Sequence, residues 1–405
     1  MAYEVEEAKR LVVEAGKKLV ETGLIARTWG NVSARISDTQ FVITPSGRAY
    51  ETLTPEEVVV VNIDDCSYEG DIKPSSEKGV HAAAYRHHPT VDFVIHTHQK
   101  AATIVSITGM EIRNVYREFQ PVLGNKVPCA AYAMSTTNSL RKKVEMCIMM
   151  NPGSRAIMMM HHGTLCMGDT YEQAFEIAET LEKCCEKVIK DNYLRHSWAK
   201  EYSEDAKRNF YLNKVGAVAM PDTICDLGSS VRNGKTFALT VGGETIDVDL
   251  KTGLGINGIA PKVAKIHKAI YETQDCKIIR HVTDPDVVAV SCTGEEMLPM
   301  IDDFAQIVGL NVKNCPWIDG DTDACAKEIG KAIDSRNAVL VQGSGALITG
   351  NTDGDMQALE IIMDKGCEAV IDVNIFNREH YVPKAECFLM RTVYLAKYSK
   401  QIDKK

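Results

Sequence analysis

The second half of this chain repeats the first half faintly, and this repeat constrains the fold more than any other feature. Residues 335–357 (SRNAVLVQGSGALITGNTDGDMQ) align with residues 154–173 (SRAIMMMHHGTLCMGDTYEQ) when one residue is inserted. CEAVI (residues 367–371) also resembles CEKVI (residues 185–189). Residues 265–291 resemble residues 79–106, again with a difference of one residue in length. All three keep the same order at a separation of about 180 residues, the size of a domain. Chance similarity between two α/β segments is the alternative, but the common order favours a duplication.

The repeat predicts one domain at about 1–214 and a second at about 215–405. Short apolar or alternating segments that are typical of strands, such as VDFVIHTH, alternate with segments of helical periodicity. Alternating strands and helices belong to the α/β or α+β class.

Composition excludes several classes of function. The 405 residues are 45% hydrophobic and 25% charged, with a net charge of −9, so there is no basic field for nucleic acid or an anionic membrane. No apolar run reaches the ~18 residues that span a bilayer. The chain starts with an amphipathic helical pattern rather than a signal peptide. We therefore expect a cytoplasmic protein that binds neither nucleic acid nor membrane, with its thirteen cysteines reduced.

Two histidines follow an apolar run in VIHTHQK, at positions 96 and 98. Alternate residues of a strand face the same side, so His96 and His98 present two imidazoles to one point while Thr97 faces away. With a third ligand from elsewhere this arrangement would chelate a metal. A pair of surface or hydrogen-bonded histidines at a strand end is the alternative.

Two other motifs are candidates to complete such a site. MMMHHGT places His161 and His162 after another apolar run, and only one of two successive strand residues can join a given site. KPSSE places Glu77 after Ser75 and Ser76 at an expected helix start, where N–H and O–H donors can bind an anion. A capping box that satisfies the helix end is the simpler interpretation of this motif.

Six motifs together carry a family resemblance over about residues 25–190. They are GNVSAR, ITPSGRAYETLTPEEVV, KPSSE, VIHTHQ, GNKVPCAAYA and HHGTLCMG, in this order. With them the first domain resembles the class II aldolase/adducin family, and within it the L-fuculose-1-phosphate aldolases. The resemblance implies an α/β fold: a three-layer α/β/α domain with a mostly antiparallel central sheet, present twice.

The resemblance also implies roles for particular residues. Zinc would be held by His96, His98 and His162, although imidazole ligands alone leave manganese or cobalt open. Glu77 would be the acid/base group and would ligate zinc when substrate is absent, and Tyr116 would donate a proton to the aldehyde oxygen. The expected phosphate-binding residues are Thr28, Gly30, Asn31, Ser46, Gly47, Ser75 and Ser76. The family often has a histidine at the position of His81, one helical turn after Glu77, where it would support the site indirectly.

The activity implied is reversible retro-aldol cleavage of a ketose 1-phosphate, or a related sugar phosphate, to dihydroxyacetone phosphate and an aldehyde. Trp29 replaces a small residue beside the expected phosphate loop, which points to a different substrate head group. Pentulose-phosphate 4-epimerases, dehydratases and decarboxylases use the same metal site, so these reactions stay open. A non-catalytic, adducin-like assembly protein is the remaining alternative.

The second copy lacks the metal-binding pattern. IHTH becomes IRHV, so Arg280, His281 and Val282 stand where the chelate was, and HHG becomes GSG with Ser344 opposite His162. We therefore expect a structural second domain without metal. Because the family forms four-fold rings, the fused pair predicts a homo-oligomer, a dimer that builds a pseudo-tetramer with two active sites.

Overall fold

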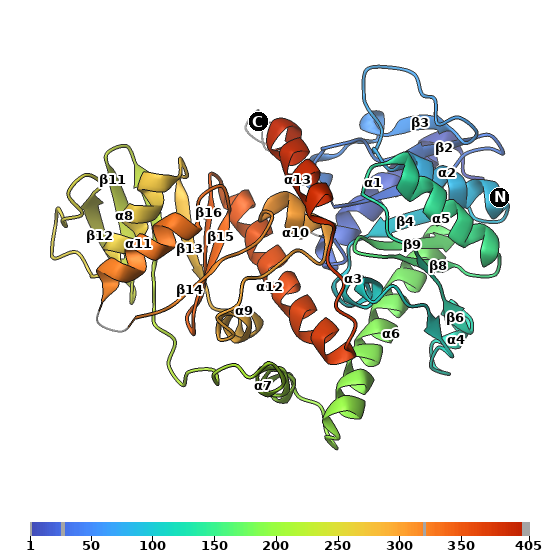
Figure 1. Cartoon of the computed structure of the whole chain (residues 1–405). Coiled ribbons are helices and arrows are strands. Elements are labelled where there is room, and N and C mark those ends of the chain that lie inside the picture. The colour runs from blue at the N-terminus through green and yellow to red at the C-terminus, as the bar shows by residue number, and fades with distance from the viewer. Residues whose placement is uncertain (1, 26–28, 319–320, 399–405) are drawn as a thin grey trace. The chain divides into compact units, whose positions relative to one another are not determined.

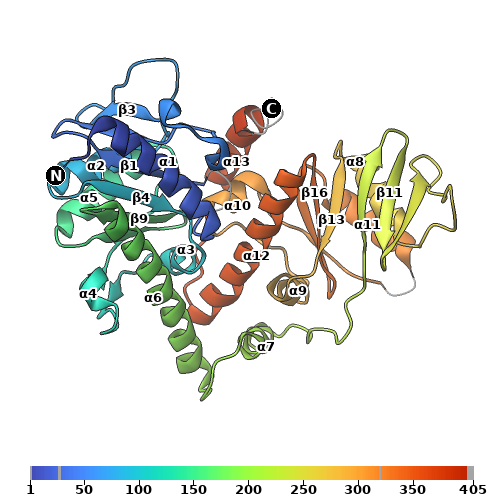
Figure 2. The ribbon, with the colours of Figure 1, turned by 180° about the vertical axis from the view of Figure 1, so that it is seen from behind.

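The computed structural model describes residues 2–25, 29–318 and 321–398. Internal contacts divide the chain into two units, the first running through Asn192 and the second from Tyr193 to Lys397. Each unit is built on a seven-stranded sheet with helices on both faces (Figures 1 and 2). None of the helices in these ranges combines the length and the hydropathy needed to cross a bilayer.

The first unit is built on a seven-stranded sheet of order β3-β2-β1-β4-β9-β8-β7. Its strands are β1 Gly30–Arg35, β2 Gln40–Ile43, β3 Val59–Asn62, β4 Phe93–Thr97, β7 Cys129–Ala130, β8 Ala156–Met159 and β9 Gly163–Gly168. All neighbours pair antiparallel except β7 and β8. A separate ribbon pairs β5 Ile112–Arg113 with β6 Lys126–Val127. The central sheet is therefore mostly antiparallel, as expected.

Helices cover both faces of this sheet. They are α1 Val5–Glu21, α2 Lys78–His87, α3 Lys100–Ile107, α4 Gln120–Leu123, α5 Asn138–Met150 and α6 Tyr171–Ser197, with 3₁₀ turns η1 Tyr50–Thr52 and η2 Pro55–Glu57. Apolar residues of α2 and α5 share a core with one sheet face, including Val94 and Leu165. On the other face α1 contacts β1 and β2, α3 contacts β8 and β9, and the Tyr171 ring of α6 packs on Phe93. The arrangement is a three-layer sandwich.

The second unit has the same topology. Its sheet order is β12-β11-β10-β13-β16-β15-β14, with β14 and β15 parallel. The strands are β10 Ser229–Asn233, β11 Thr236–Val241, β12 Glu244–Asp249, β13 Ile278–Val282, β14 Asn314–Cys315, β15 Ala338–Val341 and β16 Gly345–Gly350. The helices are α7 Glu204–Val215, α8 Ala264–Thr273, α9 Pro285–Ser291, α10 Asp302–Ile307, α11 Thr322–Ala332, α12 Asp353–Phe376 and α13 Lys384–Val393, followed by a π-helical turn, Tyr394–Tyr398. Strand for strand, this order repeats that of the first unit, and the expected duplication is confirmed.

Helix α7 lies at the start of the second unit. Its Lys207 pairs with Asp372 of α12 at 3.1 Å, and its Arg208 pairs with Asp286 of α9 at 2.8 Å. The sequence-derived boundary at 214/215 falls in the last turn of this helix, whereas the contacts divide the chain before it. Ion pairs between residues so far apart in sequence leave no local signal.

A buried Ser–His–Tyr group recurs in both units. In the first unit Ser33 Oγ lies 2.6 Å from His81 Nδ1 and 2.7 Å from Tyr85 Oη. In the second, Ser230 Oγ lies 2.7 Å from His267 Nδ1 and 2.9 Å from Tyr271 Oη. Each group joins β1 or β10, the third strand of its sheet, to the helix packed on it, α2 or α8.

We expect Gly163→Ala to destabilise the protein by about 3 kcal/mol, because the added Cβ would lie 2.2 Å from the carbonyl oxygen of Thr97 where β9 meets β4. Gly153→Ala is the matched control, since nothing lies within 4 Å of its Cβ. Thermal unfolding of both variants measures the difference, and equal melting temperatures would contradict the close approach.

Stability is expected to fall as the pH drops from 7 to 5. Burial lowers the pKa of His267 to about 4, below the ordinary value near 6.5. The unfolded chain therefore binds more protons in this window, so the stability contributed by the neutral ring is lost as the pH falls, by about 2 kcal/mol. Urea unfolding of His267→Gln at pH 7 and pH 5 should show a smaller loss than wild type; an unchanged loss would refute the assignment.

Candidate metal centre

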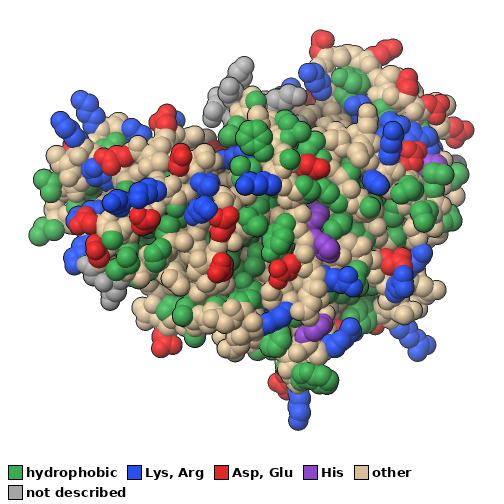
Figure 3. Space-filling model, viewed as in Figure 1, with side chains coloured by type: hydrophobic (Ala, Val, Ile, Leu, Met, Phe, Trp, Pro, Cys, Tyr) green, Lys and Arg blue, Asp and Glu red, His purple; other side chains and the backbone are tan. Residues whose placement is uncertain are grey.

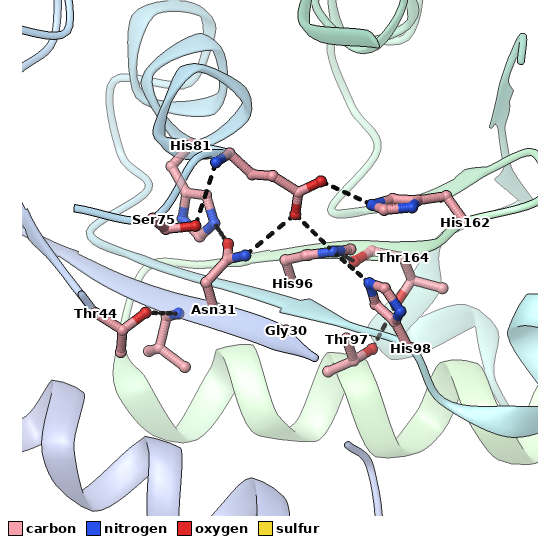
Figure 4. Close-up of polar contacts among 12 residues, drawn as sticks. Gly30, Asn31, Thr44, Ser75, His81, His96, Thr97, His98, His162 and Thr164 are labelled. Carbon is pink, nitrogen blue, oxygen red and sulfur yellow. Dashed lines mark hydrogen bonds and ion pairs between the residues drawn. The ribbon is translucent and has the colours of Figure 1, made fainter. Parts of the chain in front are cut away.

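Three histidines converge at one end of the first sheet. His96 lies in β4, His98 follows this strand, and His162 lies in the turn between β8 and β9. One ring nitrogen from each lies within 4.8 Å of the others, and the ring centroids are 4.7–5.0 Å apart (Figure 4). The structure thus brings together the three residues that were expected to bind metal. No other such group of His, Cys, Asp or Glu occurs elsewhere in the described ranges.

Local structure explains why these side chains meet. Thr97, the last residue of β4, lies between His96 and His98, faces the other side of the sheet and contacts Thr164 Oγ1 at 2.8 Å. His161 has a positive φ of 65°, and its ring packs edge-on against Tyr132, 5.0 Å between centroids. Its neighbour His162 is the one that joins the cluster. The two rings are separated by this turn and not by the alternation of a strand, which ends at Met159.

The His96 ring is oriented for metal binding. Its Nδ1 lies 2.8 Å from the carbonyl oxygen of Thr164, which can only accept a hydrogen bond. Nδ1 therefore carries a proton, and Nε2 is the ring nitrogen that faces the cluster and is left to bind a metal. Three imidazoles gathered in this way fit a divalent metal of the zinc, manganese or cobalt class.

Glu77 completes the cluster. It precedes α2, and its carboxylate oxygens lie 2.9 Å from His162 Nε2 and 3.1 Å from His96 Nε2. Asn31 Nδ2 donates to the same carboxylate at 3.2 Å. Burial alone would raise the pKa of Glu77, but the two histidines hold it well below its usual range. A capping box does not describe this glutamate, because its carboxylate bonds the histidines rather than the helix start.

The expected phosphate loops lie side by side, although Thr28 falls outside the described residues. Ser46 N–H donates to Lys73 O at 2.9 Å, and Ser75 N–H donates to Thr44 O at 3.0 Å. Gly30, at the start of β1, would place a Cβ 2.7 Å from the carbonyl oxygen of His96, so a side chain there would push β1 away from β4. The loops around residues 46 and 75 are thus held together beside the start of β1.

Individual phosphate candidates differ in what they can offer. Ser46, Gly47 and Ser76 are exposed. Ser75 Oγ accepts from the Glu77 N–H at 3.2 Å, and Asn31 bonds Glu77. On the face shown in Figure 3, acidic and basic side chains are interspersed. An anionic substrate on such a surface depends on local donors such as these.

Tyr116 lies in the segment before α4. Its ring contacts Phe119, with centroids 6.2 Å apart, and Lys187 Nζ of α6 lies 4.6 Å from the ring centroid. These contacts are with the residue that precedes α4 and with α6. Its role as a proton donor stays a prediction.

Sequence reasoning missed Ser33 and Tyr85, which reach the cluster through His81 and Asn31. A signal for them exists in the repeat, because histidine and tyrosine recur at matching positions of residues 79–106 and 265–291. Buried polar residues that recur in two copies indicate a shared hydrogen-bonded group.

The strand register corrects the comparison of the two copies. Ser33 pairs with Val94 in the first sheet, and Ser230 pairs with Ile279 in the second. Val94 and Ile279 therefore occupy equivalent positions, and two residues further along the strand His281 corresponds to His96. The expectation that Arg280 takes that place was wrong by one residue. Arg280 instead forms an ion pair with Glu360 at 2.9 Å.

The other site residues are replaced in the second unit. By the same count, Thr283 corresponds to His98. The register of β13 with β16, compared with that of β4 with β9, shows that Ser344 corresponds to His162. Val263, which precedes α8, corresponds to Glu77. The second unit keeps one imidazole of the three.

Comparison with known proteins identifies the family. The sequence model described as the class II aldolase and adducin N-terminal domain matches residues 10–189 and again 234–371. The chain belongs to the class II aldolase and adducin family. The expectation of an enzyme of this family is confirmed, and the second match covers the degenerate copy.

Several relatives are similar over less than half of this chain. A 5-deoxy-D-ribulose 1-phosphate aldolase of Bacillus thuringiensis is 31% identical over 45% of this chain and 84% of the relative. An L-fuculose phosphate aldolase of Escherichia coli K12 is 32% identical over 43% and 78%. An L-ribulose-5-phosphate 4-epimerase of Salmonella paratyphi C is 36% identical over 31% and 55%. A solved L-fuculose 1-phosphate aldolase aligns with a TM-score of 0.43 and 27% identity, over 52% of this chain and 96% of its own.

Elemental analysis of the purified protein should find about one divalent metal per chain, because only the first unit has the three imidazoles. His98→Ala should lose this metal. The control His281→Ala, which removes the single imidazole kept in the second unit, should retain it. Two metals per chain, or none, would be incompatible with this site.

Proposed function

We propose that this chain is a metal-dependent aldolase that reversibly cleaves a ketose 1-phosphate to dihydroxyacetone phosphate and an aldehyde. The observation that carries the proposal is the Glu77 carboxylate, 2.9 Å and 3.1 Å from the Nε2 atoms of His162 and His96. An acid/base group beside a metal chelate is what carbon–carbon bond cleavage next to a carbonyl needs. Relatives named as aldolases, at 31–32% identity, support the same reaction class.

His96, His98 and His162 would hold the metal, with zinc as the first candidate. When bound, it supplies Lewis-acid stabilisation of the negative charge that develops on the substrate oxygens. The neutral imidazoles leave its charge uncompensated.

Glu77 moves the carbon-bound proton. In the direction of synthesis its carboxylate removes a proton from the carbon next to the carbonyl of dihydroxyacetone phosphate, and that carbon attacks the aldehyde carbon. The aldehyde oxygen then takes up a proton, for which Tyr116 is the proposed donor, and solvent exchange restores both groups. Cleavage is the same sequence reversed.

The phosphate group would be bound by the three adjoining segments. Gly30 and Asn31 begin β1, Ser46 and Gly47 follow β2, and Ser75 and Ser76 precede α2. Backbone N–H groups of a glycine-containing loop and of a helix start bind phosphate without a lysine. This arrangement suits a protein whose net charge is −9.

A 4-epimerase of pentulose phosphates is the second candidate, because the Salmonella epimerase is 36% identical over 126 residues. Inversion at a carbon that carries a hydroxyl can use the same cleavage and re-closure. Release of the cleavage products distinguishes the two reactions, because an epimerase joins the fragments again before they leave.

We also propose that the chain assembles as a homodimer that forms a pseudo-tetramer, and that it is cytoplasmic. The identical strand order of the two units supports the ring, because two chains then supply four equivalent folds. Light scattering that finds a monomer would exclude this assembly.

Glu77→Gln should lower the turnover number by about 10²–10⁴-fold while keeping the metal, because the amide cannot take up the proton. The assay follows release of dihydroxyacetone phosphate from a panel of ketose 1-phosphates, with pentulose 5-phosphates tested for inversion. The control is His281→Ala, which should keep wild-type turnover. A metal-loaded protein that inverts without releasing product would replace the aldolase by the epimerase, and full activity in Glu77→Gln would exclude both.

A further inference from the structure

A chain of buried hydrogen bonds ends on Glu77. Tyr85 Oη lies 2.7 Å from Ser33 Oγ, which lies 2.6 Å from His81 Nδ1. On the other side of the ring His81 Nε2 contacts Asn31 Oδ1, and Asn31 Nδ2 donates to Glu77 Oε2 at 3.2 Å (Figure 4). Asn31 and Ser33 are alternate residues of β1, so both face α2, which carries the histidine and the tyrosine.

Chemistry fixes the donor and acceptor at each link. The carboxylate of Glu77 accepts only, so Asn31 must turn its NH₂ group toward it and its Oδ1 toward His81. Oδ1 also accepts only, so His81 Nε2 carries a proton. Burial lowers the pKa of His81 to about 3, so the ring is neutral and its bare Nδ1 accepts from Ser33.

We infer that His81 is a positioning residue, which fixes the amide orientation of Asn31 so that an N–H faces the carboxylate of Glu77. Without this donor, the Asn31 amide can rotate by 180° and present its oxygen to the carboxylate, where two acceptors repel each other. The inference rests on the proposed role of Glu77 as the acid/base group.

The second unit has a histidine, His267, at the position of His81, but no carboxylate stands at the position of Glu77. His267 Nε2 donates to the backbone carbonyl of Leu227 at 2.8 Å, while its Nδ1 faces Ser230. A carbonyl can only accept, so this histidine has the Nε2–H tautomer. The residue at the position of Glu77 is Val263, so here the group serves the fold alone. His267 is therefore a matched control for the structural part of the role of His81.

Two isosteric substitutions separate positioning from packing. In His81→Gln the side-chain amide nitrogen reaches the place of Nε2 and can still donate to Asn31. In His81→Asn the side-chain amide takes the place of Nδ1. It keeps the hydrogen bond with Ser33 but loses the donor to Asn31. We expect kcat to fall by about tenfold or more in His81→Asn, the loss expected for one hydrogen bond to a charged group, and by less than about threefold in His81→Gln.

The corresponding variants His267→Asn and His267→Gln should lower the melting temperature as much as their His81 counterparts but leave kcat within about twofold. Adding His81→Asn to Asn31→Ala should cost nothing beyond Asn31→Ala, because the amide that it positions is gone. Equal losses in His81→Asn and His81→Gln, a loss in His81→Asn no larger than in His267→Asn, or additive losses in the double variant would each overturn the inference.

A measurement on metal-free protein tests the hydrogen-bond direction independently of the reaction. Nitrogen-15 spectra of histidine-labelled protein, with the His81 signal assigned by its loss in His81→Gln, should show the Nε2–H tautomer. An Nδ1–H tautomer would overturn the inference. Failure of the aldolase assay leaves this result unaffected, so the two proposals fail separately.

Discussion

The pairing of β1 with β4 is the constraint on which the rest of the site depends. It sets Asn31 opposite His96 and Ser33 opposite Val94, on the sheet face that α2 and α5 cover. The close contact of the two strands requires glycine at position 30, where a Cβ would meet the carbonyl oxygen of His96. Because strand side chains alternate, a slip of one residue between β1 and β4 would put Asn31 and His96 on opposite faces of the sheet, so that only one of them could reach Glu77.

Duplication separates what the fold needs from what the chemistry needs. Both units keep the seven-strand order and the Ser–His–Tyr group between β1 or β10 and the helix packed on it. Such buried polar groups are costly to break singly, because each loss leaves a partner unsatisfied in a medium of low dielectric constant. The metal ligands carry no such penalty. The second unit could replace His98, His162 and Glu77 by Thr283, Ser344 and Val263 and still fold.

The first unit uses the same group for a second purpose. In the second unit the histidine donates a hydrogen bond to a backbone carbonyl. In the first unit it donates to the side chain of Asn31, which in turn donates to Glu77. A side chain held by packing on one side and by hydrogen bonds on the other loses little entropy when it binds, which is why catalytic groups are placed on rigid elements. The acid/base carboxylate is thus held by the same contacts that attach α2 to the sheet.

The sequence by itself determined the duplication, the α/β class and the sharing of one face by His96 and His98, because these follow from repetition and from the two-residue period of a strand. It also predicted that only one of His161 and His162 joins the site, although both lie in a turn where the alternation of a strand does not apply. The family resemblance already pointed to His162. Only the tertiary structure decided that Glu77 reaches two imidazoles, that His281 rather than Arg280 matches His96, and that Tyr116 contacts α6. Local periodicity fixes which way a side chain points along its own strand. The register between strands, and contacts between residues 46 to 85 positions apart, depend on packing that no single segment encodes.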